Sequence, residues 1–263
     1  MPQAAPDRTI WQLTGKDALS FLQGLVSNDL RPLEVAAGIV WAALLTPQGK
    51  YLADFFVIRR GDDSLLIDIA TSLAPATLRR LTMYRLRADV QISASALHVL
   101  RGLGPAPEDA LPDPRHPGLG WRVWRDVAGA APTIDWDAIR VAHGIPESGV
   151  ELIPDDSYLL EQGFERLHGV DFRKGCYVGQ EVTARMKHKT ELRKGLIRVA
   201  ITGAAPVGTA ILSGDKPAGT LFTQSGGQAL AYLRFDRLSD LTAGPARITP
   251  LPEDAPAFDP DRS

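Results

Sequence analysis

The residues best suited to chemistry lie at 172–185, because the only cysteine of the chain stands there between two glycines and beside a lysine. The stretch reads FRKGCYVGQEVTAR in one-letter code, with Cys176 near its centre. Gly175 and Gly179 are able to adopt positive φ or to let another backbone approach closely. Residues from Gln180 to Met186 are typical of a helix. We therefore expect Cys176 in a tight loop that runs into the N-terminus of a helix.

That position would favour a reactive thiol. The helix dipole and the cation of Lys174 both stabilise a thiolate on Cys176. A free cysteine is also commonly just a small buried residue, and the residues alone leave both interpretations open. One cysteine forms no internal disulfide and cannot alone hold an iron–sulfur cluster or a structural zinc, which usually take about four ligands. We expect a reducing compartment and no stably bound metal from this chain alone.

Composition narrows the function classes. The chain has 263 residues, 44% of them hydrophobic, and its 29 basic and 31 acidic residues give a net charge of −2. With so small a net charge, the protein as a whole is not attracted electrostatically to nucleic acid or to an anionic membrane. The first residues contain no apolar signal segment, and no window approaches the roughly 18 to 20 apolar residues of a membrane span. We predict a cytoplasmic protein with no nucleic-acid and no membrane partner.

Alternation and turn residues predict the elements of the first half. We expect a strand at 9–13, a helix at 17–26, and a hairpin of strands 38–46 and 51–58. Polar residues near the hairpin are interpreted as turn and cap residues on a solvated rim: Asn28, Asp29, Gln48, Lys50 and Asp54. A strand at 65–69 precedes a helix at 76–84, capped from residues 72–75. This helix and its end carry four cations, which form a solvated face or contact an acidic partner: Arg79, Arg80, Arg85 and Arg87.

The middle of the chain mixes short strands with a loop. Strand residues lie near 90–92 and 97–99, and residues 102–120 are dense in Pro, Gly and acids, which is typical of a surface loop or linker. A strand at 121–125 follows. A helix at 133–143, capped by Thr133 or Asp135 and ended by Gly144, has Trp136 in its first turn. The cations at 185–189 are interpreted either as the polar side of a helix end, where positive charge is favoured, or as an anion-binding site.

The last third predicts a separate barrel. Short strands with even spacing indicate a small antiparallel barrel; they are expected at 196–200, 209–212, 219–223, 229–233 and 246–249. We expect a body over 1–190, with a possible boundary inside 102–120, a barrel over 191–250, and a disordered tail at 251–263.

The string KGCYVGQEVTAR resembles the signature of the YgfZ-type proteins. These are bacterial relatives of a mitochondrial iron–sulfur cluster assembly factor, within the superfamily of the glycine-cleavage T-protein. Residues 144–147, 160–161 and 169–172 also resemble family segments, and the order of elements matches over most of the chain. The resemblance implies an α+β fold: a T-protein-like multi-part body around a central folate-type cavity, followed by the small barrel.

The resemblance also implies a function. The chain is expected to be a folate-binding accessory protein that serves iron–sulfur client or assembly proteins, with Cys176 and Lys174 as its working groups. Trp136 matches a pocket tryptophan and would form a wall for the pterin of tetrahydrofolate. Further folate-binding candidates are Arg185 with Lys187 at the mouth, and Tyr177, Gln180 and Glu181 of the signature. Ala142 departs from the T-protein pattern, which has a pterin-binding glutamate there, so one edge contact is missing.

Two other functions remain open. An aminomethyltransferase that uses tetrahydrofolate needs a carboxylate to orient the folate nitrogen, and Asp54 and Asp68 are the candidates by position. A docking protein would use Cys176 as one thiolate of a cluster shared with a partner, or in a transient mixed disulfide.

Overall fold

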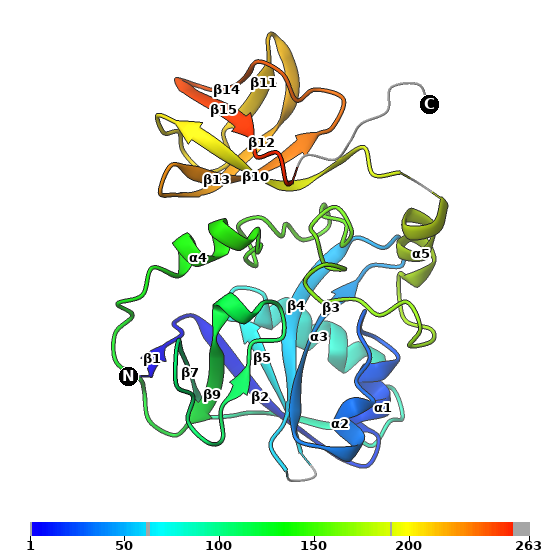
Figure 1. The fold of residues 1–263 in the computed structure, drawn as a ribbon. Coiled ribbons are helices and arrows are strands. Elements are labelled where there is room, and N and C mark those ends of the chain that lie inside the picture. The colour runs from blue at the N-terminus through cyan, green and yellow to red at the C-terminus, as the bar shows by residue number, and fades with distance from the viewer. Residues whose placement is uncertain (1, 62–63, 190, 255–263) are drawn as a thin grey trace. The chain divides into compact units, whose positions relative to one another are not determined.

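The computed structural model describes residues 2–61, 64–189 and 191–254 (Figure 1). The chain divides into two compact units. Unit 1 comprises residues 1–134, 153–159 and 164–184, and unit 2 comprises 135–152, 160–163 and 185–263. The division does not fall in the 102–120 segment, and residues 135–152 group with the C-terminal part of the chain.

Unit 1 is built on an antiparallel sheet in the order β3-β4-β5-β2-β6. Its strands are β2 Arg8–Thr14, β3 Gly38–Leu45, β4 Tyr51–Arg59, β5 Leu65–Ala70 and β6 Gln91–Ala94. The predicted hairpin is β3 and β4, joined at the 46–50 turn. One face of the sheet packs in a core with α1 Ala18–Gln23 and α3 Ala74–Arg85, while the short α2 is Pro32–Val35. Burial of these alternating apolar residues stabilises the sheet.

The opposite face of this sheet is polar and aromatic. Trp41 pairs with Phe56, and Phe56 pairs with Asp68. Because side chains alternate along a strand, Asp54 lies on the same face as Phe56. Asp54 is buried and accepts hydrogen bonds from Trp41 Nε1 at 2.8 Å and Tyr51 Oη at 2.6 Å. The expectation of Asp54 on a solvated rim is therefore wrong, since two buried donors satisfy the carboxylate.

A second sheet of unit 1 has the order β1-β7-β9-β8. Its strands are β1 Gln3–Ala4, β7 His98–Gly102, β8 Leu111–Pro112 and β9 Trp121–Arg125, with the 3-10 helix η1 at Pro117–Leu119. Residues 102–120 are therefore not simply a surface loop. Asp113 and Arg115 within them are buried, with Arg115 Nη2 2.9 Å from Asp113 Oδ2. Mutual pairing lets both charges leave water.

Two aspartates and three arginines form a charged layer in unit 1. Arg122 binds Asp113 at 2.8 Å and Asp68 at 3.3 Å, and Arg8 binds Asp68 at 2.6 Å. The Arg122 guanidinium lies 4.1 Å from the centre of the Phe56 ring. Burial alone would raise the pKa of Asp113, but Arg115 and Arg122 outweigh it and hold that pKa well below its usual range.

Unit 2 contains a closed antiparallel barrel in the order β10-β13-β12-β11-β14-β15. The strands are β10 Lys194–Thr202, β11 Ala210–Ser213, β12 Lys216–Ser225, β13 Gln228–Arg234, β14 Leu241–Ala243 and β15 Ala246–Pro250. The predicted barrel is thus present, and the strand missing from the prediction is β14, whose three residues are too short to show a pattern. Of the predicted disordered tail, residues 255–263 lie outside the described residues. Within 251–254, Asp254 binds Arg198 at 2.6 Å.

The helix α4, Trp136–His143, joins the barrel through a buried ionic cluster. Glu151 is fully buried and lies 3.1 Å from Arg140 Nη1. The same carboxylate accepts from Thr223 Oγ1 on β12 at 2.5 Å. Val141 packs with Phe222 and Leu230 of the barrel. These contacts explain why residues 135–152 belong to unit 2.

Three predicted helix boundaries need correction. The helix expected at 17–26 is only α1, because Leu25 N bonds to Leu22 O and the chain turns there. Residues 72–75 give α3 no side-chain cap, and α3 starts at Ala74. The helix expected at 133–143 begins at Trp136, with the Asp135 carboxylate accepting from Ala138 N at 2.9 Å as one of the two predicted caps.

Candidate functional site

The Cys176 loop has the predicted form. Gly175 has φ +93° and Gly179 has φ +84°, and α5 follows directly at Gln180–Lys189. The thiol of Cys176 is exposed. Gln180 connects the start of the helix to the loop. Its backbone N–H donates to Tyr177 O at 3.2 Å, and its side-chain Oε1 accepts from Tyr177 N at 3.3 Å. The turn thus presents the sulfur to solvent at the start of a helix.

Close backbone packing fixes where this loop lies. A Cβ on Gly179 would stand 2.5 Å from Thr46 O and 3.1 Å from Gly49 Cα. A Cβ on Gly49 would stand 2.8 Å from Val182 Cβ on α5. The β3–β4 turn and the loop therefore approach each other at two glycines, where no side chain fits. The sequence indicated a special backbone at Gly179 but not its contact with the β3–β4 turn.

Lys174 anchors the other side of the loop. Its side chain is buried, and its Nζ donates to Gln23 O and to Val26 O, each at 2.6 Å. These carbonyls lie at and just after the end of α1, where backbone acceptors lack helical partners. Burial lowers the pKa of Lys174 to about 8, while nearby Asp29 and Asp171 oppose that effect. The Lys174 ammonium thus binds backbone carbonyls at the end of α1. The expectation that it stabilises a thiolate on Cys176 stays a prediction.

The segment before the loop is tied to the residues after α1. Ser27 Oγ donates to Gly169 O at 2.7 Å, and Asn28 Nδ2 donates to His168 O at 2.7 Å. Asp171 N donates to Ser27 O at 3.0 Å. Asn28 therefore has a structural role in holding residues 168–171, in agreement with its interpretation as a turn-stabilising residue.

The predicted folate residues are divided between the two units. Lys174 Nζ is 4.7 Å from the centre of the Tyr177 ring, and burial raises the pKa of Tyr177. Gln180 and the exposed Glu181 open α5 in unit 1, whereas Trp136 and Arg185 belong to unit 2. Trp136 is only 7% exposed.

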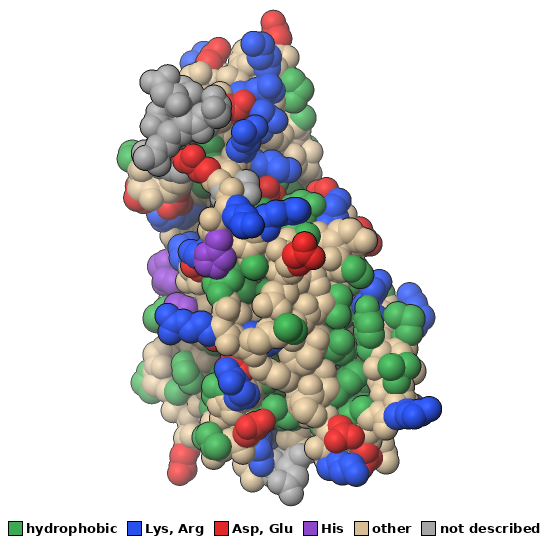
Figure 2. All heavy atoms as spheres, turned by 90° about the vertical axis from the view of Figure 1, so that its right-hand side faces the viewer, with side chains coloured by type: hydrophobic (Ala, Val, Ile, Leu, Met, Phe, Trp, Pro, Cys, Tyr) green, Lys and Arg blue, Asp and Glu red, His purple; other side chains and the backbone are tan. Residues whose placement is uncertain are grey.

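The basic run at the end of α5 is solvent-exposed. Arg185, Lys187, His188 and Lys189 are all exposed. Figure 2 shows the side of the molecule on which α5 lies, with Lys, Arg and His side chains at the level of this helix. Cations near a helix C-terminus are stabilised by the helix dipole, so this run has a structural explanation as well as the predicted role at a folate mouth.

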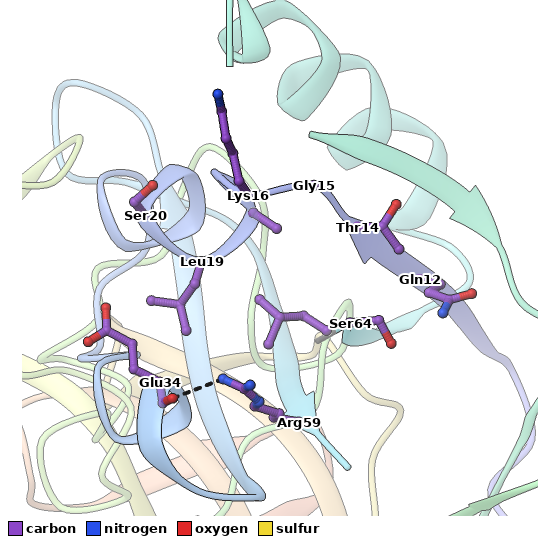
Figure 3. A pocket seen from close by; sticks show the side chains of 11 residues that line it. Gln12, Thr14, Gly15, Lys16, Leu19, Ser20, Glu34, Arg59 and Ser64 are labelled. Carbon is purple, nitrogen blue, oxygen red and sulfur yellow. Dashed lines mark hydrogen bonds between the residues drawn. The ribbon is translucent and has the colours of Figure 1, made fainter. Parts of the chain in front are cut away.

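A separate cavity of about 740 Å³ in unit 1 is lined from β2, α1 and the end of β4. None of the predicted site residues lines it. Figure 3 shows that its polar side chains do not converge: Lys16 points away from Arg59, and Arg59 is bonded to Glu34 O, at 3.0 Å. Ligand sites need polar groups aimed at one place, so the cavity lacks the arrangement of a binding site.

Among the residues that the structure describes, no three or more His, Cys, Asp or Glu side chains are grouped as metal ligands. Within the same residues, every helix is too short or too polar to cross a bilayer.

Comparisons with known proteins agree on one group. Residues 193–257 match the family of the CAF17 C-terminal β-barrel domain. The chain is 34% identical over 232 residues to "Iron-sulfur cluster assembly factor IBA57 homolog, mitochondrial" of Mycosarcoma maydis, covering 76% of this chain and 58% of that protein. It thus spans less than two thirds of the fungal relative.

Mammalian relatives are covered more fully. The chain is 30% identical to "Iron-sulfur cluster assembly factor IBA57, mitochondrial" of Mus musculus, over 86% of this chain and 72% of that one. The protein of the same name from Homo sapiens is 31% identical, over 83% and 70%.

A solved structure supplies the fold. The crystal structure of the glycine cleavage system aminomethyltransferase T from Bartonella henselae superposes with a TM-score of 0.75 at 13% identity, covering 95% of this chain and 84% of that one. At that identity the likeness concerns the fold alone. The predicted T-protein-like fold with a C-terminal barrel is therefore confirmed.

Proposed function

The chain belongs to the family of the iron–sulfur cluster assembly factor IBA57, and from this membership we propose that it is an accessory factor in the assembly or repair of iron–sulfur proteins. The fold is shared with an aminomethyltransferase, and a shared fold does not define an activity. The proposal therefore depends on the family and on the chemistry of one exposed thiol.

The observation that carries the proposal is the exposed Cys176 in the loop that leads into α5. Its loop is anchored on two sides, by Gly179 against the β3–β4 turn and by Lys174 in the end of α1. A thiol presented in this way reaches a partner without rearrangement of the chain. Since an iron–sulfur cluster takes about four protein ligands, Cys176 would supply one and an assembly or client protein the others.

Tetrahydrofolate remains a proposed ligand that the described residues fit poorly. Ala142 offers the pterin no carboxylate, and its carbonyl accepts a hydrogen bond from Arg198 Nη1 at 2.8 Å. The indole of Trp136 is almost fully buried. We therefore derive no step of assembly through folate. Titration calorimetry with tetrahydrofolate tests it: measurable heat of binding supports the folate proposal, and no heat removes it.

No observation favours the aminomethyltransferase alternative. Each carboxylate oxygen of Asp54 already accepts a hydrogen bond from a side chain, and Asp68 is bound by two arginines. A carboxylate that orients a substrate nitrogen must direct an oxygen to it. Both candidate carboxylates are instead engaged within unit 1.

The compartment is a separate proposal. The relatives are named as mitochondrial proteins, while we propose a cytoplasmic location for this chain. Fractionation of the source cells followed by immunoblotting decides between the two.

The function itself is tested by deleting the gene and measuring two activities separately. We expect the activity of cluster-containing enzymes to fall while glycine cleavage is unchanged, with restoration by the wild-type gene. Loss of glycine cleavage with intact cluster enzymes would overturn the proposal in favour of the transferase.

A further inference from the structure

The C-terminal end of α3 carries a concentration of positive charge that the proposed function does not use. Residues 79–89 contain four arginines and one aspartate, within a chain whose net charge is −2. Arg79, Arg85 and Arg87 are exposed and Arg80 is half-buried. Among the described residues, no carboxylate lies within ion-pair distance of any of the four. Arg85 Nη1 donates to Val90 O at 3.3 Å, so the charge open to a partner is mainly that of Arg79, Arg80 and Arg87.

Two large apolar side chains are exposed among these arginines. Met83 is 61% exposed and Leu86 is 87% exposed, whereas Leu81 on the inner side of α3 is completely buried. Residues 79, 83 and 86 are spaced four and three apart, so they follow one face of the helix and its end. The set Arg79, Arg80, Met83, Leu86 and Arg87 is called the α3 surface below.

The backbone at Leu86 is strained. This residue ends α3 with φ +46° and ψ −105°, a sparsely populated backbone region that costs a non-glycine residue on the order of 1–3 kcal/mol. Its side chain gains little burial in return, since it is 87% exposed. Glycine would adopt the same backbone without that cost. Folding alone therefore gives no reason for a leucine here.

The turn that follows Leu86 is held in place at Asp89. Asp89 N donates to Asp17 Oδ2 at 2.8 Å, and Asp17 N donates to Asp89 O at 3.2 Å. A Cβ on Gly15 would lie 2.1 Å from Asp89 O, so the two segments are in close contact. These contacts fix the backbone three residues after Leu86, which lowers the entropic cost of ordering this turn on binding.

We propose that the α3 surface docks an acidic protein segment that places apolar side chains on Met83 and Leu86 and carboxylates on the surrounding arginines. An apolar centre with a rim of arginines is the usual anatomy of a protein interface, where Met and Arg are enriched. Single-stranded nucleic acid would call for exposed aromatic side chains between the cations, whereas Tyr84, the aromatic residue of this stretch, packs against the core of unit 1. A membrane surface would call for a full apolar helix face. The site is distinct from the Cys176 loop.

The direct test uses the full chain and a labelled synthetic peptide in which leucines alternate with pairs of glutamates. Fluorescence anisotropy measures its binding to the wild type and to Arg79→Glu/Arg87→Glu. We expect the double substitution to weaken binding at low salt at least about tenfold, and added salt to weaken wild-type binding. The matched control, Lys216→Glu/Arg247→Glu, makes the same change of net charge at exposed positions of the barrel and is expected to bind like the wild type.

Leu86→Gly separates binding from folding. We expect it to raise the urea midpoint of unfolding, because strain is released, and to weaken peptide binding. A lower midpoint would mean that Leu86 serves the fold and would overturn the argument from strain. No binding to the wild type, or equal weakening in the barrel control, would overturn the proposal. So would tighter binding of an oligothymidylate or of phosphatidylserine vesicles through the same arginines.

Discussion

The contact between Gly179 and the β3–β4 turn leads to a prediction with an internal control. Gly175 and Gly179 flank the Cys176 loop, and both have positive φ, +93° and +84°. A Cβ on Gly175 would meet nothing within 4 Å, whereas one on Gly179 would stand 2.5 Å from Thr46 O and 2.9 Å from Leu45 Cβ. Alanine at the two positions therefore differs in packing and not in the sign of φ.

The expected magnitudes follow from that difference. Alanine at either glycine carries the cost of positive φ, on the order of 1–2 kcal/mol. Alanine at Gly179 also forces apart packed atoms, which adds about 1–3 kcal/mol. We expect Gly175→Ala to lower the free energy of unfolding by about 1–2 kcal/mol, and Gly179→Ala by about 2–5 kcal/mol.

Urea unfolding followed by circular dichroism measures both variants against the wild type. Labelling of Cys176 by iodoacetamide gives a second readout, since a displaced loop in Gly179→Ala changes its rate more than Gly175→Ala does. Equal destabilisation by the two alanines would refute the close approach, and so would a milder effect at Gly179.

Three other predictions concern buried or capping groups. Burial lowers the pKa of Lys174 from 10.5 to about 8. Between pH 8 and pH 10.5 the unfolded chain therefore holds a proton on Lys174 that the folded chain has lost. The free energy of unfolding consequently increases as the pH rises through this range. Relative to Lys174→Met, the wild type should gain on the order of 3 kcal/mol from pH 8 to 10.5; parallel pH profiles of unfolding would contradict this. Glu151→Gln should cost about 1.5–3 kcal/mol, because it removes the fully buried carboxylate from Arg140, which keeps Asp137 at 2.9 Å, and a urea midpoint like that of the wild type would show that the Arg140–Glu151 pair contributes nothing. Asp135→Ala removes the acceptor for Ala138 N and should cost about 1 kcal/mol in thermal unfolding, while an unchanged Tm would mean that the cap is not needed.

Local sequence patterns were sufficient to predict those elements whose structure depends on residues close by in the chain. Gly175, Gly179 and the helix after them predicted the Cys176 loop, and turn residues at regular spacing predicted the barrel. In both cases the signal lies within a few residues, because turns need particular backbone angles and helix starts need particular residues.

Contacts distant in sequence could not be predicted in this way. Lys174 binds carbonyls 151 and 148 positions earlier in the chain, and nothing in its own neighbourhood distinguishes it from a surface lysine. Asp54 was misplaced for the same reason, since its burial depends on Trp41 from the paired strand. The grouping of Trp136 with the barrel depends on the Arg140–Glu151 pair and β12, which no single-segment pattern contains.

Replacement of one sulfur by oxygen tests the central claim most directly. Cys176→Ser, expressed in the deletion strain, should leave cluster-containing enzymes as inactive as the empty vector does, although the protein folds with an unchanged urea midpoint. Arg173→Ser, an exposed position of the same loop, is the matched control and should restore activity like the wild type. Full restoration by Cys176→Ser would contradict the account, because the thiol would then have no part in the work of this protein.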